Sequence, residues 1–324
     1  MKNKKAIIFG AAGFIGNHLV ARLKAEGYWV RGVDLVSPKY QLSEADEFLL
    51  GDLRDASFVA SCITEGIDEL YQLAADMGGA GYVFTGENDA NIMHNSALIN
   101  LHSLELALKW KVKKIFFASS ACIYPKHNQE DALAPICAED SAYPAMPDSE
   151  YGWEKLFSER LYEAYRKNYG LVCKIARFHN IYGPQSVYEG GKEKAPAAIC
   201  RKVALAKEGE QIEVWGTGQQ TRSFLFIEDC LDAIRLFMDK DGFYGPINIG
   251  STEMISINDL TKMVIALSGK SLGIKNIAGP VGVNGRSSDN ALIERELKWS
   301  TQYQLAKGMQ VLYHWIEDQL NKQK

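Results

Sequence analysis

The sequence predicts an α/β protein built on a doubly wound parallel sheet, with a smaller, interleaved C-terminal lobe. Short apolar runs of strand length alternate with amphipathic stretches of helical period through the first half of the chain. A glycine-rich turn separates the first apolar run from the first amphipathic stretch. The composition agrees, because 324 residues with 47% hydrophobic and 23% charged side chains are typical of a folded globular chain of one or two domains.

The expected strands and helices alternate regularly along the first half of the chain. The first strand covers residues 5–9, and helical spacing follows over 14–26. Further apolar runs predict strands over 28–34, 69–74, 114–118 and 171–178. Leucines at helical spacing predict a helix over 96–110, and another helical pattern covers 151–169. Strands that alternate with helices in this way build a parallel sheet with both faces covered.

The second lobe is expected to begin after Asn180, where turn-forming glycine and proline residues interrupt the alternation of strands and helices. Tyr-Gly-Pro at 182–184 and Gly-Gly at 190–191 precede a helical stretch over 196–207, a strand over 211–215 and a turn at 216–218. Sheet and helix return over 223–238, and beyond 256 short helices dominate up to an amphipathic one over 305–320. No repeat or low-complexity linker separates the lobes. We therefore expect interleaved domains, with residues 1–182 and 223–250 in one and residues 183–222 and 251–324 in the other.

The charged and sulfur-containing residues exclude several classes of protein. With 36 basic and 40 acidic residues the net charge is −4, and no long basic block occurs, which disfavours nucleic acid as the main partner. The cysteines lie at positions 62, 122, 137, 173, 200 and 230, without a Cys-x-x-Cys pair or histidines at zinc spacing. Neither a disulfide framework nor a metal site is expected, and reduced thiols fit a cytoplasmic protein.

The N-terminal segment resembles a signal peptide only superficially. Lys2, Lys4 and Lys5 precede an apolar run over 6–16, but no cleavage site of small residues follows, and the glycines in the run have an explanation of their own. No apolar stretch reaches the roughly 18 residues that a membrane-spanning helix needs. We therefore expect a soluble protein without a membrane partner.

The clearest local motif is Gly10-Ala-Ala-Gly13-Phe14-Ile15-Gly16, between the first predicted strand and helix. The first glycine permits a tight turn, the second lets the backbone approach a pyrophosphate, and the third lets the helix pack on the strand. Asp34 ends the next strand, where a carboxylate binds a ribose 2′-hydroxyl and repels a 2′-phosphate. The motif predicts a Rossmann domain that binds NAD rather than NADP; the alternative is that the glycines serve only turns. Further cofactor contacts are expected after later strands, at Asp52, Leu53 and Ala74.

A second motif, Tyr151-x-x-x-Lys155, begins a predicted helix. Its i, i+4 spacing puts both side chains on one face, although an exposed helical pair has the same pattern. The motif follows a strand and Ser119-Ser120, all downstream of the glycine turn. This combination resembles the extended short-chain dehydrogenase/reductase superfamily. The resemblance implies that Tyr151 accepts a proton, that Lys155 lowers the pKa of Tyr151 and holds the ribose, and that Ser120 hydrogen-bonds the reacting oxygen.

Within that superfamily, six runs resemble the GDP-mannose 3,5-epimerase family. They are residues 73–79, 118–125, 177–184, 190–198, 220–224 and 285–290. The most specific features are the cysteine two places after Ser120 and the Lys-Glu-Lys-Ala-Pro segment at 192–196. Related 4,6-dehydratases carry an Asp-Glu pair in place of Ala121-Cys122. The resemblance implies an NAD-dependent enzyme that epimerises a nucleotide sugar, GDP-D-mannose to GDP-L-galactose or GDP-L-gulose.

The resemblance also assigns roles to individual residues. It implies that Cys122 and Lys194 are the acid/base pair of epimerisation. The residues expected to contact the sugar nucleotide are Gly79, Ser120, Cys122, Asn180, Glu193, Lys194, Ala195, Lys202, Gln220, Thr221, Arg222 and Arg286. The cationic groups among them would pair with the diphosphate. Two departures from the plant members lie near the expected sugar pocket: Lys192 replaces an arginine, and Tyr188-Glu189 replaces Trp-Lys.

Three interpretations of the function remain open on the sequence. The leading one is epimerisation at C3, C5 or both through transient oxidation at C4. The second is another NAD-dependent nucleotide-sugar enzyme, a 4-epimerase or a 4-dehydrogenase. The third is a non-catalytic NAD-binding protein, which would be expected to have lost the Tyr151 and Lys155 pair.

Two further features have structural explanations. Leucines at 98, 101, 104 and 108 form a stripe that suits a core or a dimer face. In the superfamily this helix and the one that carries Tyr151 pair across a two-fold axis into a four-helix bundle, so the resemblance implies a homodimer. His179 is expected to be a structural hydrogen-bonding residue beside Asn180 rather than a base.

Overall fold

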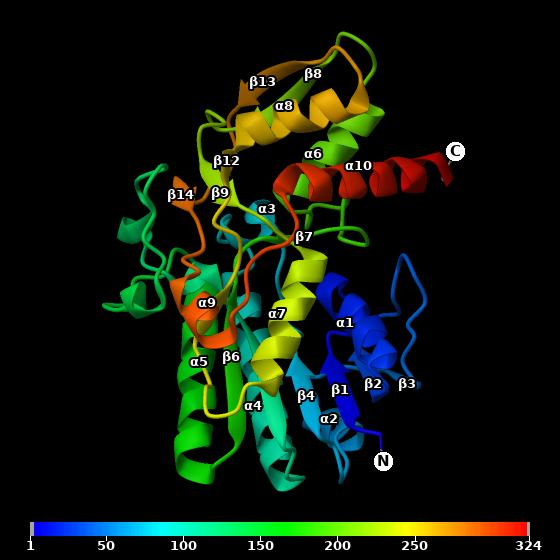
Figure 1. The fold of residues 1–324 in the computed structure, drawn as a ribbon, viewed down its shortest axis with the longest axis vertical. Helices are drawn as coiled ribbons and strands as arrows, with labels where there is room; N and C mark the ends of the chain where they lie inside the picture. Colours follow the sequence, from blue (N-terminus) through cyan, green and yellow to red (C-terminus); the bar gives the residue numbers. More distant parts are fainter. Residues whose placement is uncertain (1–2, 323–324) are drawn as a thin grey trace.

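Seven parallel strands form the central sheet of the computed structural model, which describes residues 3–322 (Figure 1). In spatial order they are β3 (Glu47–Leu50), β2 (Trp29–Asp34), β1 (Lys5–Phe9), β4 (Glu69–Gln72), β5 (Lys114–Ser120), β6 (Val172–Phe178) and β11 (Ile247–Ile249). The strand order runs outward in both directions from β1 and β4, which is the doubly wound arrangement. The predicted fold class is confirmed. Because all these strands are parallel, their carboxyl ends meet at one edge of the sheet, where ligands bind in this architecture.

Helices cover both faces of the sheet, because successive side chains of β1 point to opposite faces and are apolar on both. Ile7 and Phe9 belong to one hydrophobic core, and Ala6 and Ile8 belong to the core on the opposite face. On the first face lie α2 (Ala56–Cys62), α4 (Asp89–Lys109) and α5 (Glu150–Tyr169); on the second lie α1 (Phe14–Ala25) and α7 (Ile227–Asp239). A strand buried on both faces needs apolar residues at every position, which explains the continuous apolar run of β1.

The second lobe contains three helices, which pack against one another, and two small sheets (top of Figure 1). Its helices are α6 (Ala195–Leu205), α8 (Ile257–Ser268) and α10 (Leu305–Lys322). β8 (Gln211–Trp215) pairs with β13 (Gly273–Ile277), and β9 (Thr221–Ser223) lies between β12 (Met254–Ser256) and β14 (Gly285–Arg286). At the junction of the lobes, β7 (Ile181–Tyr182) pairs with β10 (Leu225–Phe226).

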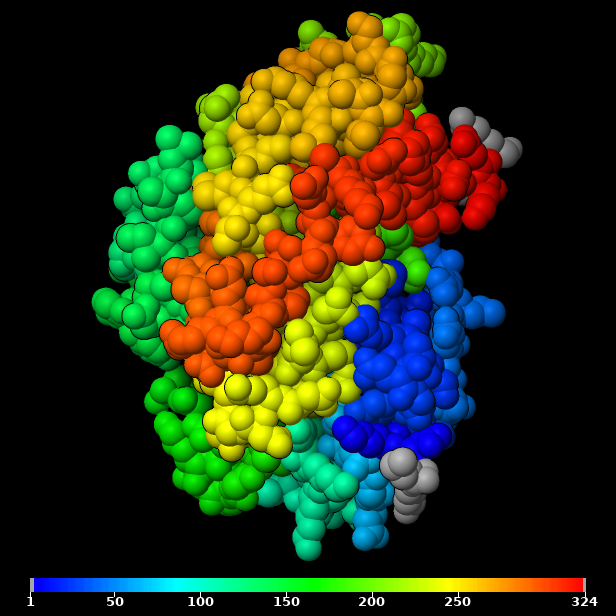
Figure 2. Space-filling model, in the orientation of Figure 1, coloured from blue at the N-terminus to red at the C-terminus, as the bar shows by residue number. Residues whose placement is uncertain are grey.

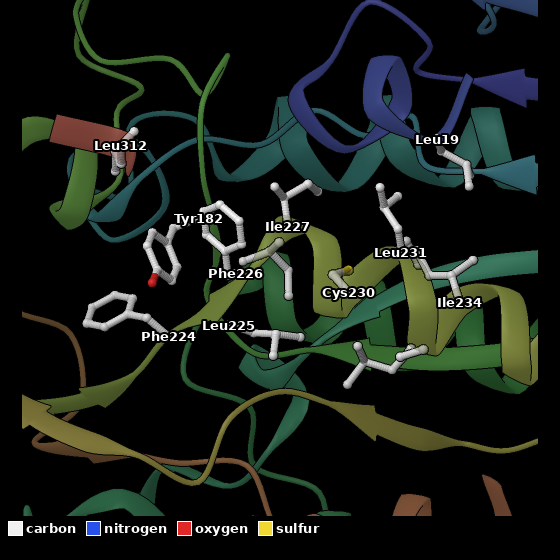
Figure 3. Packing of buried hydrophobic residues seen from close by; sticks show 14 of the residues in the cluster. Leu19, Tyr182, Phe224, Leu225, Phe226, Ile227, Cys230, Leu231, Ile234 and Leu312 are labelled. Atoms are coloured by element: carbon white, nitrogen blue, oxygen red, sulfur yellow. The ribbon is translucent and has the colours of Figure 1, made fainter. Parts of the chain in front are cut away.

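One hydrophobic cluster continues from the sheet into the second lobe. Figure 3 shows Leu19 of α1 close to Leu231 of α7, and Tyr182 and Phe226 at the junction of the lobes. Leu312 of α10 belongs to the same cluster. The lobes therefore share apolar packing, which burial of these side chains stabilises.

The C-terminal segment crosses the face of the molecule and contacts both lobes. In Figure 2 the chain beyond residue 280, in orange and red, runs over the front of the sheet domain and up to the second lobe. α9 (Ala291–Leu297) packs on β11 and α7, whereas α10 packs on α6 and α8. Among residues 3–322, no helix combines the length and the apolar content that crossing a membrane requires.

Most predicted boundaries agree with the structure to within a few residues, but the expectation beyond residue 256 was wrong in part. That region contains two strands, β13 and β14, as well as helices. β13 is a largely exposed strand with the sequence Gly-Ile-Lys-Asn-Ile, so it lacks a continuous apolar run. α4 also begins earlier than predicted, at Asp89. The prediction missed its first turns because Ile92 is their one buried apolar residue, so they show no apolar periodicity.

A buried polar network joins the ends of β5, β6 and β11. The Tyr124 hydroxyl donates to Asn248 Oδ1 at 2.6 Å, and His179 Nε2 donates to the same oxygen at 2.9 Å. Arg177 bonds to the Tyr124 hydroxyl and forms a buried ion pair with Glu159 of α5 at 2.8 Å. Burial lowers the pKa of His179 to about 3, although the bond to Asn248 opposes that shift. His179 is therefore a neutral structural residue, as predicted.

Replacing His179 by glutamine tests this assignment through the pH dependence of stability. The unfolded chain binds a proton at His179 below about pH 6.5 that the folded chain excludes, so the free energy of unfolding should rise with pH across this range. Between about pH 7.5 and about pH 5 the histidine should cost the wild type about 2 kcal/mol, and the His179→Gln variant should lack that loss. Urea denaturation at several pH values measures both proteins. A constant difference between them across the range would contradict the assignment.

Candidate functional site

The glycine turn after β1 brings backbone atoms closer together than side chains would allow. Gly10 has a φ of +83°, and a Cβ there would lie 2.9 Å from the backbone nitrogen of Ala74. A Cβ on Gly16 would lie 2.0 Å from the Gly10 carbonyl oxygen, so only glycine lets α1 begin this close to β1. Gly13 is the N-cap of α1 and provides no side-chain cap. The N–H groups of the first turn thus remain available to a phosphate.

Asp34 lies beside this turn at the end of β2. One carboxylate oxygen accepts a hydrogen bond from Ala12 N at 2.9 Å, and the other accepts one from Val36 N at 3.3 Å. These bonds fix the carboxylate where the ribose of a bound dinucleotide would meet it.

The remaining cofactor candidates surround the same edge of the sheet. Hydrogen bonds from Arg54 lower the pKa of the Asp52 carboxyl, and the two side chains form an ion pair at 2.6 Å. The Leu53 side chain is buried in the core, so only its backbone is available to a ligand. Ala74 follows β4 directly beside Gly10. The residues present therefore fit an extended dinucleotide that lies across the carboxyl ends of the strands.

Tyr151 and Lys155 occupy the first turns of α5. Ser149 caps this helix by accepting a hydrogen bond from Gly152 N at 3.2 Å. Lys155 Nζ donates to Ala118 O in β5 at 3.0 Å and lies 5.7 Å from the centre of the Tyr151 ring. Both side chains are buried. The start of the helix thus brings the predicted pair together at the end of β5.

Burial is the largest influence on the pKa values of Tyr151 and Lys155. Burial raises the pKa of Tyr151, the Cys122 thiol and Glu154 raise it further, and the hydrogen bond with Ser120 opposes the shift. Burial lowers the pKa of Lys155, whereas Glu154 raises it. In the protein alone the phenol therefore keeps its proton, and additional positive charge is needed to make it a base.

Cys122 lies in a single turn of 3₁₀ helix directly after β5, at residues 121–123. Its N–H donates to Ser120 Oγ at 3.2 Å, and Arg286 Nη1 donates to its Sγ at 3.2 Å. A Cβ on Gly152 would lie 2.2 Å from Cys122 O, so the first turn of α5 rests directly on this 3₁₀ turn. Burial raises the pKa of the thiol, and Arg286 opposes that shift. The other five cysteines are buried, whereas Cys122 keeps partial exposure.

Arg286 is held by two residues that the sequence motifs did not identify. Its Nε donates to Gln129 Oε1 at 2.6 Å, and its Nη2 donates to the Asp148 carboxylate. Burial acts to lower the pKa of Arg286, but Cys122 and Asp148 raise it, so the guanidinium stays charged. Gln129 and Asp148 lie between β5 and α5, in a segment without periodic pattern. The sequence therefore carried no signal for their burial.

Arg222 lies beside Arg286 on the neighbouring strand, in register. Its guanidinium donates to Thr221 O at 2.8 Å and to Val281 O at 3.0 Å. Burial, reinforced by Arg286, lowers the pKa of Arg222 to about 10. Of these two guanidiniums, that of Arg286 pairs with the Asp148 carboxylate, and among residues 3–322 no ion pair is found for Arg222, which leaves an excess of positive charge here. An anionic ligand would neutralise it.

Lys194 is the N-cap residue of α6. Its side chain keeps contact with solvent, and none of the residues that the structure describes forms an ion pair with its ammonium. Desolvation by nearby protein atoms lowers the pKa of Lys194, and the Cys122 and Cys230 thiols oppose that shift. Gly79 packs against the preceding residues: its N–H donates to Lys192 O at 3.1 Å, and a Cβ there would lie 2.2 Å from Glu193 O.

The other predicted substrate residues mostly form hydrogen bonds with backbone groups of nearby segments. Asn180, with a φ of +45°, donates to Ser223 O at 2.9 Å. Lys202 donates to Glu213 O at 2.7 Å, and Gln220 donates to another carbonyl of β8. The rest are Glu193, which accepts a hydrogen bond from Gly191 N, Ala195, which starts α6, and Thr221, which donates to Ala132 O. The structure thus brings Cys122, Tyr151, Ser120 and Arg286 together, while the Lys202 and Gln220 side chains bond to β8.

The arrangement is suited to repeated proton transfer. A phenol, a thiol and an ammonium can each give and take a proton, and the Ser120 hydroxyl can bond to a reacting oxygen. The neighbouring guanidiniums can hold an anion near these groups. Within residues 3–322, no three His, Cys, Asp or Glu side chains converge as a metal site would require.

Known proteins that resemble this chain in sequence or in structure include several nucleotide-sugar epimerases. The model of the NAD dependent epimerase/dehydratase family matches residues 6–250. GDP-mannose 3,5-epimerase of Arabidopsis thaliana is 43% identical over 327 aligned residues, which cover 100% of this chain and 85% of the relative. UDP-glucose 4-epimerase of Thermotoga maritima, solved with UDP-glucose, superimposes with a TM-score of 0.86 at 25% identity over 98% of this chain and 99% of that one. UDP-glucuronic acid 4-epimerase of Bacillus cereus, solved with NAD, gives a TM-score of 0.82 at 26% identity over 97% and 99%.

A methyl group at Gly152 tests the contact between α5 and the 3₁₀ turn. In Gly152→Ala the new Cβ must push the Cys122 carbonyl away from a 2.2 Å approach. A displacement of about 1 Å should lower turnover roughly a hundredfold, while the NAD content of the purified protein stays unchanged because the glycine turn is untouched. Gly81→Ala is the matched control, since its Cβ would meet only the Trp215 side chain at 3.4 Å. Equal turnover in the two variants would contradict the importance of this contact.

Proposed function

The chain belongs to the NAD dependent epimerase/dehydratase family, and from this premise we propose that it epimerises GDP-D-mannose at C3, C5 or both, to GDP-L-galactose, GDP-L-gulose or both. The relatives named GDP-mannose 3,5-epimerase support this substrate. The observation that carries the proposal is the Cys122 thiol, bonded to Arg286 and close to Tyr151. A simple 4-epimerase needs only the groups that serve oxidation at C4, whereas Cys122 and Lys194 supply a second acid/base pair.

NAD is the cofactor of this family, and the residues around the glycine turn fit it. Gly13 and the first turn of α1 would meet the pyrophosphate, Asp34 the adenosine ribose and Lys155 the nicotinamide ribose. When bound there, NAD would supply a hydride acceptor and donor for C4 of the sugar, with no net oxidation over the cycle. The protein therefore gains by keeping its cofactor through many turnovers.

Tyr151 takes the proton of the C4 hydroxyl as the hydride departs. Burial raises the pKa of this phenol in the protein alone. The Lys155 ammonium and the positive charge of the bound cofactor favour the phenolate instead. Lowering a phenol pKa from about 10 to about 7 requires roughly 4 kcal/mol of differential stabilisation, which two cationic charges in a buried site can provide. Ser120 donates a hydrogen bond to the C4 oxygen.

Oxidation at C4 gives a ketone whose neighbouring C3 and C5 hydrogens become acidic, because the carbonyl delocalises the resulting negative charge. Inversion requires one group to remove a proton from one face and another to return a proton to the opposite face. We assign these roles to Cys122 and Lys194. After reprotonation of carbon, Tyr151 returns its proton to the C4 oxygen as the hydride comes back. Of the Cys122 and Lys194 pair, one group has gained a proton and the other has lost one, and exchange with solvent restores their starting protonation before the next turnover.

The positive groups of the second lobe are proposed to bind the nucleotide diphosphate. Arg222 and Arg286 lie side by side on β9 and β14, and Lys202 and Lys194 belong to α6 and its cap. Guanidiniums bind phosphate oxygens in pairs, and lysines act as point charges. The local excess of positive charge accommodates an anionic substrate on a chain with a net charge of −4.

We assign residues 1–182 and 223–250 to the NAD-binding domain and residues 183–222 and 251–324 to the sugar-nucleotide lobe. The packing of α6, α8 and α10 against one another supports this division, while α9 packs on the sheet domain despite its place in the sequence. We also place the protein in the cytoplasm, since all six cysteines are free and a reducing compartment preserves them.

A homodimer is proposed through α4 and α5, which lie side by side on one face of the sheet. Large apolar side chains are exposed on both helices: Leu101 at 38%, Trp153 at 41% and Phe157 at 50%. Burying such side chains against a second copy would complete a four-helix bundle. In the predicted leucine stripe, Leu104 is buried in the core and Leu101 is exposed. One part of the stripe therefore packs in the core, and the other part is available to a dimer interface.

Labelling from solvent tests the proposed reaction. Incubation of the enzyme with GDP-mannose in D₂O should place deuterium at C3 or C5, because protons removed there exchange with solvent. A 4-epimerase returns the original hydride to C4 and incorporates no label. Mass spectrometry and NMR of the recovered sugar identify the labelled carbons. No label with GDP-mannose or any other nucleotide sugar would rule out the mechanism.

Two variants assign that exchange to its residues. Tyr151→Phe should slow turnover by at least about a hundredfold, because the base for C4 oxidation is lost. Cys122→Ala should abolish exchange while the purified protein retains NAD. If exchange in Cys122→Ala equals that of the wild type, the role of Cys122 is withdrawn; full turnover in Tyr151→Phe would revive a non-catalytic NAD-binding function.

The dimer proposal is tested by placing charge on the exposed apolar face. The double variant Trp153→Glu, Phe157→Glu should be monomeric in sedimentation velocity, because four carboxylates would meet at the two-fold interface. Leu236→Glu is the control, since Leu236 is 45% exposed on α7, on the opposite face of the sheet. A wild type that sediments as a monomer, or a double variant that stays dimeric, would refute this interface.

A further inference from the structure

Asp148 is a buried carboxylate that links the two parts of the proposed site. Its side chain is 2% exposed. One oxygen accepts a hydrogen bond from Arg286 Nη2, whose guanidinium also donates to Cys122 Sγ at 3.2 Å. The other oxygen accepts a hydrogen bond from Ser149 Oγ at 2.9 Å. Since Ser149 caps α5, one carboxylate touches both the partner of the thiol and the start of the helix that carries Tyr151.

The backbone around Asp148 is fixed on both sides. Lys126 N donates to Met146 O at 2.9 Å, and Pro125 and Pro147 form a β-bridge. The segment that follows Cys122 therefore runs beside the segment that ends at Asp148. This pairing leaves the carboxylate little freedom to leave the Arg286 guanidinium.

The charge of Asp148 matters because a guanidinium by itself would favour the Cys122 thiolate. A thiolate held in such an ion pair has no proton to give. Asp148 balances the guanidinium and raises the pKa of Cys122. The charged and titratable groups that face Cys122 are Arg286 of β14, Asp148 before α5, Tyr151 and Lys155 of α5, Lys194 before α6, and Arg222 of β9. Of these, Asp148 bears the negative charge.

We propose that Asp148 is a positioning residue that holds the Arg286 guanidinium against the Cys122 sulfur and balances its charge, so that Cys122 carries a proton it can deliver to the sugar. This inference rests on the acid/base role proposed above for Cys122. Asp148 itself touches neither substrate nor cofactor in this scheme. Its effect is transmitted through Arg286.

Alkylation of Cys122 by iodoacetamide reads this effect without substrate. Cys122 is the cysteine that keeps partial exposure, so the label reports on it, and Cys122→Ala gives the background. In Asp148→Asn the shape is kept and the charge removed, so the alkylation rate at neutral pH should rise roughly tenfold as its pH dependence moves to lower pH. Ser149→Ala is the control, because it removes the other bond to Asp148 and the helix cap without changing charge. It should lower the melting temperature and leave the alkylation profile in place.

The same variants are then measured for solvent exchange into GDP-mannose. Asp148→Asn should shift the pH dependence of exchange to lower pH and reduce its rate about tenfold on the alkaline side, while Ser149→Ala keeps the wild-type profile. If Asp148→Asn does not fold, Gln129→Glu adds a carboxylate at the Arg286 Nε and should move the alkylation profile to higher pH.

Two failures are distinguishable. A wild type that exchanges no solvent deuterium defeats the proposed function, whereas the alkylation profiles still measure the charge balance at Cys122. A wild type that does exchange, with Asp148→Asn matching Ser149→Ala in both profiles, overturns the role of Asp148. An alkylation profile for Gln129→Glu that stays in place or moves to lower pH overturns it equally.

Discussion

The close packing of the first turn of α5 on the 3₁₀ turn after β5 sets the geometry of the site. It depends on Gly152, where a Cβ would lie 2.2 Å from the Cys122 carbonyl oxygen. Because Tyr151 precedes this glycine and Ser120 precedes the turn, the contact brings phenol, hydroxyl and thiol together. Lys155 Nζ strengthens the same junction by donating to Ala118 O in β5. A rigid helix and a rigid strand thus define positions that loops would leave loose.

The site also depends on contacts between the two lobes. Arg286 comes from β14 in the second lobe, while its partners Asp148 and Cys122 lie between β5 and α5 of the sheet domain. Gly79 in turn packs against the Glu193 carbonyl, next to Lys194. An ion pair buried as completely as Arg286 with Asp148 contributes little net stability, but losing one partner leaves an uncompensated charge and typically costs about 3 to 5 kcal/mol. The pair therefore favours one docked arrangement of the lobes over others.

Residue spacing along short stretches of the sequence predicted the features of the fold and the site that depend on one short stretch alone. The glycine turn, the strands β1, β2, β4, β5 and β6 and the Tyr151–Lys155 pair each follow from spacing along a continuous stretch, and the structure has them where predicted. No range was predicted for β3 or β11, which complete the sheet. Asp148 and Gln129 could not be found in this way, because their burial results from the return of β14 more than a hundred residues later. β13 was missed for a similar reason: its pairing with β8 gives an exposed strand structure that its own composition does not favour. The hydrogen bond from Lys202 to Glu213 O of β8 likewise joins two segments and has no signal in the sequence around Lys202.

Cys122 and Lys194 are tuned in opposite directions by one physical cause. Desolvation disfavours charge, so it raises the pKa of the Cys122 thiol and lowers the pKa of the Lys194 ammonium, although the Lys194 side chain still meets solvent. The position of Lys194 at the N-terminus of α6 acts in the same sense, because the positive end of the helix dipole disfavours a cation there. A thiol ordinarily loses its proton at lower pH than an ammonium, so these shifts bring the two proton affinities closer together. Two groups of similar proton affinity can each act as donor or acceptor, and inversion of a stereocentre requires one of each.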